Sequence, residues 1–222
     1  MLVLTSVFCL IATVVGGIPF GYLVGRLVLK DDIRLHGSGN IGATNVARVL
    51  GWKWGGLVLF LDAMKGLGPT LAAKLFLPSS IAADSVQFAV ILTGICAIVG
   101  HMYPIWLRLR GGKGVATALG VVLVISPMAT GVAFLLFVVA IAATRIVALS
   151  SIIAAIGFAV TQFTLLGKTA LNVQNLPLAV FSVIVPLLII WRHRSNIVRL
   201  WRGEEKKISS RSNASPLSDA KP

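Results

Sequence analysis

The stretch VATALGVVLVISPMATGVAFLLFVVAIAA, which runs from Val115 to Ala143, decides the fold of this chain. It is apolar throughout, yet it is longer than the roughly 20 residues that one helix needs to cross a bilayer core. Ser126 and Pro127 interrupt it near the middle, and proline removes a backbone donor and breaks a helix. The run therefore either crosses the membrane once or turns back at Ser126-Pro127 as two short arms.

The composition of the whole chain excludes an ordinary soluble protein. Its 222 residues are 57% hydrophobic and 12% charged, with a mean hydropathy of +0.93. A soluble domain usually carries about 25% charged residues, and a disordered chain needs the opposite composition. Lys and Arg outnumber Asp and Glu by 20 to 7, which gives a net charge of +13. We therefore expect anionic partners, namely phosphates or lipid headgroups, and no nucleic acid.

Other apolar runs of membrane-spanning length flank the first stretch. They lie at about 2–25, 55–77, 86–107, 146–167 and 174–191. Because backbone polar groups in lipid must be paired within their own segment, these runs are expected to be helices. The first run lacks the basic start and the cleavage site of a signal peptide, so we expect it to be retained. Cys9 and Cys96 lie inside such runs and are expected to be small apolar side chains.

The positive charges give the helices a direction. Short loops rich in Lys and Arg stay in the cytoplasm. Here they comprise residues 26–53, 108–113, Arg145 and 192–202. A single crossing of Val115–Ala143 would separate the last two clusters from the first two, whereas a turn at Ser126-Pro127 puts all four on one face. We therefore predict an all-α polytopic bundle of about seven transmembrane segments, with the N-terminus outside and the C-terminus in the cytoplasm.

The domain organisation follows from the same pattern. Residues 1–203 contain every apolar run and are expected to form one membrane domain. After Gly203 the composition shifts to Ser, Lys, Asn and Pro, which cannot build a core. Residues 204–222 are therefore expected to be a flexible cytoplasmic tail.

The first predicted cytoplasmic loop is the most informative polar stretch. Residues 37–48 read GSGNIGATNVAR, with three glycines among small hydroxyl and amide side chains. Glycines let a backbone curl around a ligand and point N–H groups at it, as in anion-binding nests. An arginine can add a bidentate hold on phosphate. The candidate substrate-binding residues are Gly37, Gly39, Asn40, Thr44, Asn45 and Arg48, and Ser38 is a candidate catalytic residue.

The sequence of this loop has two other interpretations. Gly37, Gly39 and Gly42 satisfy the spacing G-x-G-x-x-G, and Asp62 lies twenty residues further on, as in dinucleotide-binding proteins. That fingerprint requires a preceding strand within a βαβ unit, whereas here an apolar span precedes it. A plain flexible linker is the second alternative, but it does not need Asn, Thr and Arg side chains together.

A second cluster of glycines and basic residues precedes Val115. Residues 100–117 read GHMYPIWLRLRGGKGVAT. A glycine turn that leads into a helix N-terminus is suited to bind anions, because free N–H groups and the helix dipole point the same way. Gly111, Gly112 and Lys113 are the candidates here. The sequence is not a Walker A loop, which has Ser or Thr after its lysine. The alternative is a tight turn with a lysine that obeys the positive-inside rule.

Polar residues in two predicted helices are further candidates. Asp62 and Lys65 are three residues apart in an apolar run and could pair on one helix face. The sequence allows both a structural ion pair and a functional role for Lys65. His193 and Asn196 likewise share a face, and flanking arginines should keep His193 neutral; the alternative is an interfacial anchor for headgroups. Ser151 either binds substrate or satisfies a carbonyl of its own helix.

These segments, in this order, closely resemble the bacterial membrane glycerol-3-phosphate acyltransferases of the PlsY type, which use acyl phosphate as donor. The resemblance extends from Ile18 to Asn196. Its three motifs are the loop 37–48, the segment Lys65–Pro69 and the segment Gly100–Thr117. Two positions depart from the family pattern: Ile41 stands where proline is usual, and Ala148 where a serine is common.

The resemblance implies a seven-helix protein of the bacterial inner membrane with its active site facing the cytoplasm. It implies transfer of a fatty acyl group from acyl phosphate to the sn-1 hydroxyl of glycerol 3-phosphate, giving lysophosphatidic acid and phosphate for phospholipid biosynthesis. The implied partners are these two substrates and membrane lipids, without a cofactor. Residues that match the family's site are Ser38, Arg48, Lys113, Ser151, His193 and Asn196.

The residues suit this reaction without a covalent intermediate, because an acyl phosphate is already activated. No histidine is followed by aspartate at the spacing of a His-Asp acyltransferase motif. We hypothesise that a substrate phosphate oxygen, oriented by His193 and Asn196, accepts the proton of the glycerol hydroxyl. Arg48 and Lys113 would hold phosphate, and Ser38 would position the reacting groups. The glycine and cation clusters are thus expected to meet in one pocket.

The main rival is a membrane transporter for an organic phosphate, since broken helices and glycine loops also build anion sites. A transporter gathers polar groups near the midplane, whereas here they are predicted at one face. A lipid-binding scaffold would not need the Gly, Asn, Thr, Arg and Lys clusters. The few acids and histidines are scattered, so no metal site is expected.

Overall fold

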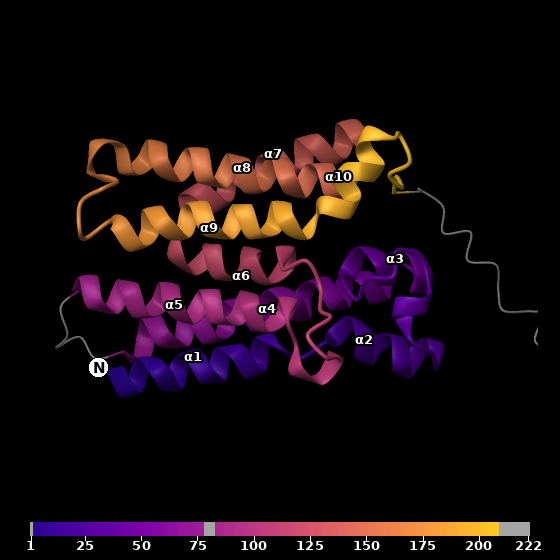
Figure 1. Cartoon of the computed structure of the whole chain (residues 1–222), viewed down its shortest axis with the longest axis horizontal. Coiled ribbons are helices and arrows are strands. Elements are labelled where there is room, and N and C mark those ends of the chain that lie inside the picture. Colours follow the sequence, from indigo (N-terminus) through magenta and orange to yellow (C-terminus); the bar gives the residue numbers. More distant parts are fainter. Residues whose placement is uncertain (1, 78–82, 209–222) are drawn as a thin grey trace, which may run out of the picture.

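The computed structural model describes residues 2–77 and 83–208, and every regular element within them is a helix. The long helices are α1 (Leu2–Gly16), α4 (Trp52–Phe76), α5 (Ala83–Met102), α6 (Val115–Ile125), α7 (Pro127–Thr144), α8 (Val147–Leu166) and α9 (Leu176–Arg192). The short ones are α2 (Phe20–Val24), η1 (Gly25–Leu29), η2 (Ile33–Leu35), α3 (Ala43–Leu50), η3 (Ile105–Leu107), η4 (Gly167–Thr169) and α10 (Arg194–Trp201). The long helices lie side by side along one axis, with α2, α3 and α10 at one end (Figure 1).

The helices have the lengths and composition of membrane spans. Five segments are long and apolar enough to cross a bilayer: Leu2–Leu29, Trp52–Phe76, Ser85–Leu107, Pro127–Thr144 and Val147–Thr169. Helices α9 and α10 qualify together but are bent by 59°. Helix α6 is apolar but has only 11 residues, which is shorter than a bilayer crossing needs. The predicted polytopic helical bundle is confirmed, and α6 is the shortest of its long helices.

The long apolar run turns back, as predicted. Helix α6 ends at Ile125, and α7 begins with Pro127 in its first turn, where a missing N–H is tolerated. Ser126 Oγ donates to Gln162 Oε1 of α8, which pairs a polar group at the break. The beginning of α6 and the last turns of α7 line the same cavity. The chain therefore returns along α7 to the end from which α6 started (Figure 1).

The basic clusters share one end of the bundle. The segment between α1 and α4, the loop before α6, the turn between α7 and α8 and helix α10 all lie at the right of Figure 1, and the N-terminus of α1 lies at the left. This arrangement agrees with the prediction that a turn at Ser126-Pro127 puts all four clusters on one face. Which side of the membrane this face contacts stays a prediction.

Close backbone contacts at glycine hold the first half of the bundle together. A Cβ on Gly66 of α4 would lie 2.1 Å from the carbonyl oxygen of Thr117, and one on Gly120 of α6 would lie 2.0 Å from that of Ala63. The same reciprocal contact joins α1 to α5, through Gly16 against Ala97 and Gly100 against Thr13. Membrane helices pack most closely where small residues meet. These glycines therefore fix the two helix pairs that frame the polar end.

Replacing Gly120 with leucine is expected to destabilise the protein. The new side chain would meet the α4 backbone, and overpacking of this kind costs about 1–3 kcal/mol. Thermal unfolding in detergent should show a lower Tm. The matched control is Gly131→Leu, because a Cβ at Gly131 of α7 meets nothing within 4 Å. Equal Tm values for the two variants would contradict the packing argument.

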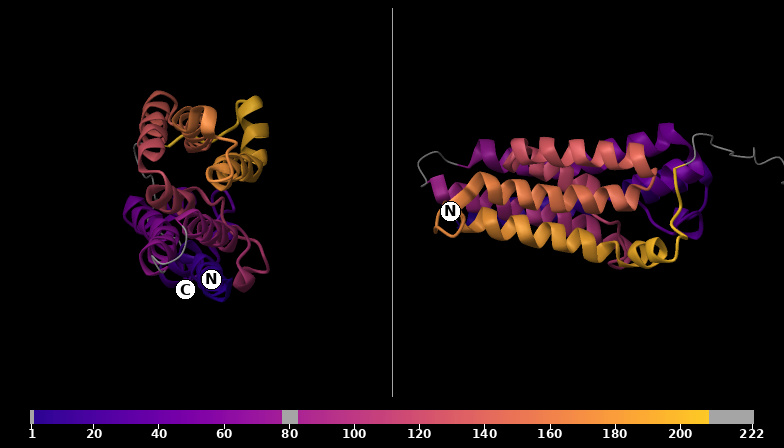
Figure 2. Two further views of the ribbon diagram at one scale, coloured as in Figure 1. Left: turned by 90° about the vertical axis from the view of Figure 1, so that its left-hand side faces the viewer. Right: turned by 90° about the horizontal axis from the view of Figure 1, so that it is seen from above.

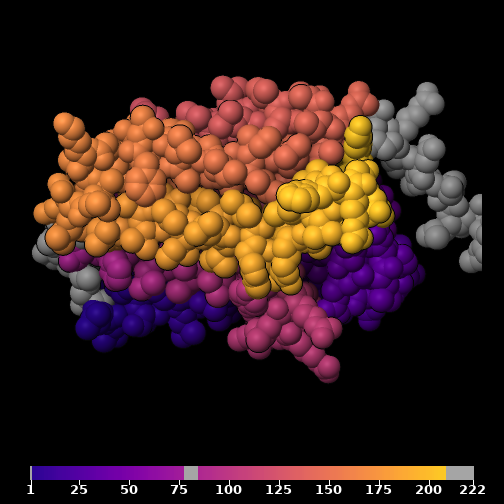
Figure 3. All heavy atoms as spheres, turned by 45° about the horizontal axis from the view of Figure 1, so that its top comes forward, coloured from indigo at the N-terminus to yellow at the C-terminus, as the bar shows by residue number. Residues whose placement is uncertain are grey.

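A short apolar loop projects beside the polar end. Pro104 lacks an N–H, so α5 stops at Met102 and residues 103–107, which the sequence pattern placed in the third run, leave the helix. Ile105, Trp106 and Leu109 are exposed by 74%, 65% and 56%. Figure 3 shows this stretch protruding from the body of the molecule. A Trp among exposed apolar residues and arginines is typical of an anchor at the membrane interface.

Candidate active site

A cavity of about 410 Å³ opens at the basic end of the bundle. Its walls come from α3, α4, the start of α6, the end of α7, the start of α8, the α9–α10 junction and residues 205–208. Its lining combines a polar set and an apolar set of residues. The polar lining residues are Ser38, Asn40, Thr44, Asn45, Arg48, Asp62, His101, Lys113, Ser151, His193, Asn196, Glu205 and Lys206. Among the apolar ones are Trp52, Leu59, Phe137, Ile141 and Val147.

Asn45 organises the glycine loop. Its side chain is 1% exposed, and its Oδ1 accepts hydrogen bonds from the backbone N–H of Ser38 (2.6 Å) and from Ser38 Oγ (3.1 Å). Its Nδ2 donates to the carbonyl oxygens of Ile33, His36 and Asn40. Both polar atoms of the Asn45 amide, Oδ1 and Nδ2, are thus used in hydrogen bonds to the loop and the segment before it. It presents Ser38 to the cavity rather than acting as a free ligand group.

Two glycines of this loop are required by its path. Gly37 and Gly39 have φ of +64° and +70°, a conformation that is costly for side chains with a Cβ. A Cβ on Gly37 would also lie 2.2 Å from Asn45 Oδ1. Neither glycine lines the cavity. Their role is to bring the loop past Asn45.

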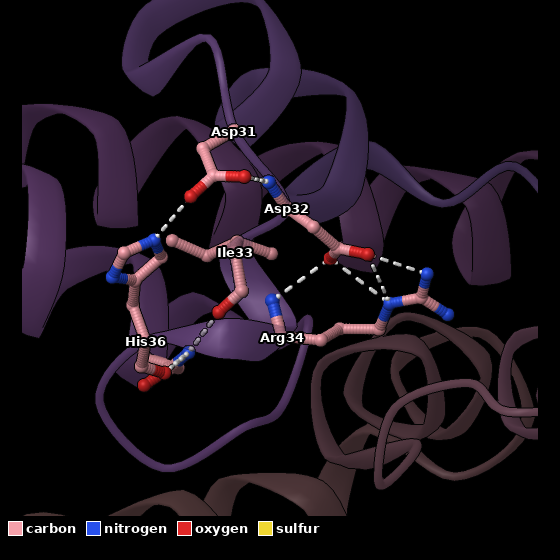
Figure 4. Close-up of polar contacts among 6 residues, drawn as sticks. Asp31, Asp32, Ile33, Arg34 and His36 are labelled. Atoms are coloured by element: carbon pink, nitrogen blue, oxygen red, sulfur yellow. Dashed lines mark hydrogen bonds and ion pairs between the residues drawn. The ribbon is translucent and has the colours of Figure 1, made fainter.

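The segment that leads into the loop is folded by its own ion pairs. His36 Nε2 lies 2.8 Å from Asp31 Oδ2, and Arg34 Nη2 lies 2.6 Å from Asp32 Oδ2. Figure 4 shows these contacts on either side of Ile33, whose carbonyl oxygen accepts from Asn45. The side-chain hydrogen bond to His36 holds the pKa of Asp31 below its usual range. These contacts stabilise the segment that leads into the loop. The cations of the cavity come from other residues.

The turn formed by Gly111 and Gly112, which precedes Lys113, is held from two sides. Arg192 Nη2 donates to the carbonyl oxygens of Gly111 (2.9 Å) and Gly112 (2.7 Å), and Arg192 Nε donates to Gly112 (3.1 Å). On the other side, a Cβ on Gly112 would lie 2.1 Å from His101 Nε2, and the Gly112 N–H donates to the His101 carbonyl oxygen. The two glycines therefore shape the turn that presents Lys113.

Lys113, Asn196 and His193 line the cavity together with Ser38 and Asn40 of the glycine loop. Lys113 Nζ donates to Asn196 Oδ1. His193 lies at the bend between α9 and α10, is 2% exposed, and its Nδ1 is 2.8 Å from the carbonyl oxygen of Ile189. A carbonyl oxygen only accepts, so Nδ1 carries the proton and donates it. The neutral ring then offers Nε2 as an acceptor.

Burial lowers the pKa of Lys113 to about 8, so its charge is expected to titrate within the working range. Because its pKa is depressed, the ammonium is present below about pH 8 and is lost as the pH rises through that value. The affinity of the free enzyme for glycerol 3-phosphate should fall above that pH, as measured by calorimetry. Lys113→Arg keeps its charge over this range and should remove the fall; the same fall in both proteins would contradict the assignment.

Asp62, Lys65 and His101 form a buried polar cluster, and Asp62 and His101 reach the cavity lining. Lys65 Nζ lies 2.8 Å from Asp62 Oδ1 and donates to the carbonyl oxygen of Ile18 at 2.7 Å. His101 Nδ1 lies 3.6 Å from the same carboxylate oxygen. The predicted pair of Asp62 and Lys65 is thus confirmed. Breaking a buried pair by removing one partner is strongly destabilising, by about 3–5 kcal/mol, so the contacts of Lys65 are those of a structural residue.

The structure brings most of the candidates together. Those that line the cavity are Ser38, Asn40, Thr44, Asn45, Arg48, Lys113, Ser151, His193 and Asn196. Ser151 Oγ donates to the carbonyl oxygen of Val147 in its own helix. The candidates outside the lining are Gly37, Gly39, Lys65, Gly111 and Gly112. The expectation that the glycine and cation clusters meet in one pocket is confirmed.

Several residues near the site were missed by sequence reasoning. Arg192, which holds the Lys113 turn, was only part of the basic cluster 192–202, and His101 was not singled out as a site residue. Glu205 and Lys206 were assigned to a flexible tail, but they line the cavity and have defined hydrogen bonds. The predicted flexibility of residues 209–222 concerns positions outside the described residues. Within the described residues, no three His, Cys, Asp or Glu side chains are grouped to hold a metal ion.

Fold and cavity together define an integral membrane protein with a cavity at one end of a helical bundle, which is lined by cations and by apolar side chains. A family model described as glycerol-3-phosphate acyltransferase matches residues 6–203. The chain belongs to this family.

Individual relatives and structures agree with the family. The glycerol-3-phosphate acyltransferase of Myxococcus xanthus (strain DK1622) is 44% identical over 204 residues, which cover 92% of this chain and all of the relative. That of Staphylococcus aureus (strain JH9) is 41% identical and covers 91% of this chain and 96% of the relative. The crystal structure of PlsY (YgiH), an integral membrane glycerol 3-phosphate acyltransferase, in its glycerol 3-phosphate form is 38% identical, with a TM-score of 0.82, over 92% of this chain and 96% of that one. Its lysophosphatidic acid form has a TM-score of 0.78, over 92% and 95% of the two chains.

These matches confirm the resemblance inferred from the motifs. The protein is a membrane enzyme that acylates glycerol 3-phosphate. The cavity described above is the candidate for its active site.

Proposed function

We propose that this enzyme takes its acyl group from acyl phosphate and releases lysophosphatidic acid and inorganic phosphate. The observation that carries the proposal is the mixed lining of the cavity, which combines the cations Arg48 and Lys113 with a set of apolar side chains. A donor with a phosphate head and a fatty tail fits such a site, because each part meets its own kind of surface. The resemblance to the PlsY type supports the same donor.

The apolar part of the lining suits the fatty chain. Trp52 and Leu59 of α4 contribute to it, and so do Phe137 and Ile141 of α7. Leu59, Trp52 and Phe60 are also exposed on the bundle surface, so α4 continues from the cavity into a lipid-facing surface. We infer that the acyl chain lies between α4 and α7 and reaches the bilayer there.

The polar part of the lining suits the two anionic heads. Arg48 and Lys113 hold phosphate, with Asn40 and Thr44 beside them, and Ser38 positions the reacting groups. His193 Nε2 accepts a hydrogen bond from the sn-2 hydroxyl of glycerol 3-phosphate, which orients the substrate and leaves the proton of the sn-1 hydroxyl free for transfer. Positioning and charge stabilisation of this kind supply much of the rate in phosphate chemistry. The contribution of Ser151 is limited by its hydrogen bond to Val147.

The proposed reaction needs no covalent enzyme intermediate. The sn-1 hydroxyl oxygen forms a bond to the acyl carbonyl carbon, and the bond from that carbon to the phosphate oxygen breaks. A substrate phosphate oxygen accepts the hydroxyl proton, so the leaving group departs as hydrogen phosphate. His193 and Asn196 orient the hydroxyl and phosphate for this transfer.

The donor is tested with the full-length protein purified in detergent. Labelled glycerol 3-phosphate is incubated with palmitoyl phosphate, palmitoyl-CoA or palmitoyl-acyl carrier protein. We expect labelled lysophosphatidic acid and an equal amount of inorganic phosphate with the first donor alone. Turnover with a thioester and none with acyl phosphate would overturn the proposal. A transporter is disfavoured because the polar lining lies at one end of the bundle, and it would yield no product.

We further propose that the cavity faces the cytoplasm of a bacterial inner membrane. The bacterial sources of the relatives and the basic clusters around the cavity support this orientation. A Lys207→Cys variant, with Cys9 and Cys96 replaced by alanine, should react with an impermeant maleimide in inverted vesicles and not in intact cells. Labelling in intact cells would contradict the orientation.

A further inference from the structure

The chain crosses the mouth of the cavity after α10. Lys206 Nζ donates to the carbonyl oxygen of Gly37 at 3.3 Å, and the N–H of Ile208 donates to that of Arg145 at 2.7 Å. Gly37 belongs to the glycine loop and Arg145 to the turn between α7 and α8. Figure 2 shows the yellow chain leaving α10 and running across this end of the bundle. Residues 205–208 therefore join parts of the molecule that are far apart in sequence.

Glu205 is the polar centre of this crossing. Its Oε1 accepts from Asn196 Nδ2 at 2.7 Å, and its Oε2 accepts from Arg199 Nε at 2.7 Å. Its side chain is 9% exposed. A charge with so little access to water stays ionised only when it is paired, and Arg199 supplies the partner charge.

The contacts of Asn196 fix how its amide is oriented. Lys113 is on one edge of the amide and can only donate, so it takes the oxygen. Glu205 is on the other edge and, when ionised, can only accept, so it takes the nitrogen. If Glu205 were lost, nothing among these contacts would hold the nitrogen, and the amide could rotate to present an N–H group toward Lys113.

Glu205 does not neutralise the cations assigned to the substrate. Its one ion pair within 4.0 Å in the described part of the chain is with Arg199. Lys113 and Arg48 are therefore not ion-paired with it, although both line the same cavity. Glu205 therefore supports the site and does not take the place of the substrate phosphate.

We propose that Glu205 is a positioning residue of the active site, which holds the amide of Asn196 with its oxygen toward Lys113. The inference rests on the proposed roles of Lys113 and Asn196 in the site. It gives the segment after α10 a function in the reaction, where the sequence pattern indicated a loose tail.

The charge of Lys113 offers a readout of this arrangement. Four charged groups act on it: Arg48 of α3, Arg192 of α9, Arg199 of α10 and Glu205. The three arginines disfavour the ammonium, and Glu205 alone among these four favours it. Removing the carboxylate should therefore lower the pKa of Lys113, whereas a loss of folding would not move it in a defined direction.

The experiment compares Glu205→Gln and Glu205→Ala with the wild type in the full chain. Glu204→Gln is the matched control, because Glu204 is exposed and its replacement removes the same charge at the neighbouring position. Two quantities are measured: kcat/KM with acyl phosphate, and the pH dependence of glycerol 3-phosphate binding by calorimetry. Thermal unfolding reports whether each variant is folded.

We expect Glu205→Ala to lower kcat/KM by about 10- to 100-fold, the range of one hydrogen bond to a charged group. Glu205→Gln should lose less, because its amide oxygen can still accept from Asn196. In both variants the alkaline fall in binding should begin at lower pH, and Glu204→Gln should match the wild type within about twofold.

The outcomes separate this inference from the proposed donor. Wild-type turnover with an unchanged or raised kcat/KM in Glu205→Ala, or an unmoved alkaline fall, would overturn the positioning role. A raised value would indicate that the segment obstructs the site. If acyl phosphate gives no turnover in the wild type, the proposed donor fails, and the shift in the binding profile still decides for or against Glu205.

Discussion

Lys113→Met is expected to lower kcat/KM for glycerol 3-phosphate by about 10²–10³-fold, the cost of losing one preorganised charge-stabilising group. Three observations make this residue central. It lines the cavity, its turn is held by Arg192 and His101, and its ammonium contacts Asn196. Methionine has similar length and no charge, so the change removes the phosphate contact while filling the same space. Steady-state kinetics with varied glycerol 3-phosphate measure the effect.

The control for this variant is Lys207→Met. Lys207 is exposed and lies outside the cavity lining, in the segment that crosses its mouth. The control should stay within about twofold of the wild type, and Lys113→Arg should recover part of the loss, because it restores charge with different geometry. Equal activity of Lys113→Met and Lys207→Met would remove Lys113 from the site.

Much of the fold could be predicted because lipid leaves the backbone few choices. Apolar runs must be helices, and the basic clusters decide parity without any tertiary information. Ser126 and Pro127 mark the turn within the long run, and the structure breaks there. The short length of α6 follows from that break, but its packing could not be predicted, because periodicity does not show that its glycine face packs against α4 rather than facing lipid.

The site was predictable where its chemistry is local in sequence. Ser38 and Arg48, and likewise Lys113, stand in glycine-rich segments whose composition indicates anion binding, and they line the cavity. Whether a glycine touches the substrate or only shapes the loop depends on the path of the backbone. Gly37 and Gly112 belong to the second kind, since a Cβ at either would meet Asn45 or His101.

The residues that were missed act through the bend at His193. Helices α9 and α10 are bent by 59° there, so that Arg192 reaches the Lys113 turn while Asn196 reaches Lys113 itself. The same bend directs the following chain back over the cavity, which brings Glu205 to Asn196. A sequence pattern gives no bend angle, so charged residues after the last span read as a solvated end.

His193→Ala is expected to lower kcat by about 100-fold or more with little change in KM for glycerol 3-phosphate. The Nδ1 proton is held by the Ile189 carbonyl oxygen, which leaves Nε2 to accept from the sn-2 hydroxyl of the substrate and so to orient the sn-1 hydroxyl. A proton taken up by this ring would create an imidazolium beside the cations Lys113 and Arg192. No carboxylate in the described part of the chain forms an ion pair with His193 to stabilise that charge. The ring is therefore suited to orient the hydroxyl rather than to act as the base.

A matched series separates orientation from base catalysis. His193→Gln can keep an amide oxygen near the position of Nε2, so it should retain more kcat than His193→Ala if the ring orients the hydroxyl. If His193 were the base, glutamine would be as inactive as alanine, since an amide does not take up the proton. Trp201→Ala, on the exposed side of α10, controls for changes in that helix. Wild-type turnover in His193→Ala would remove the residue from the mechanism, and the substrate phosphate would then have to orient the hydroxyl through Asn196 alone.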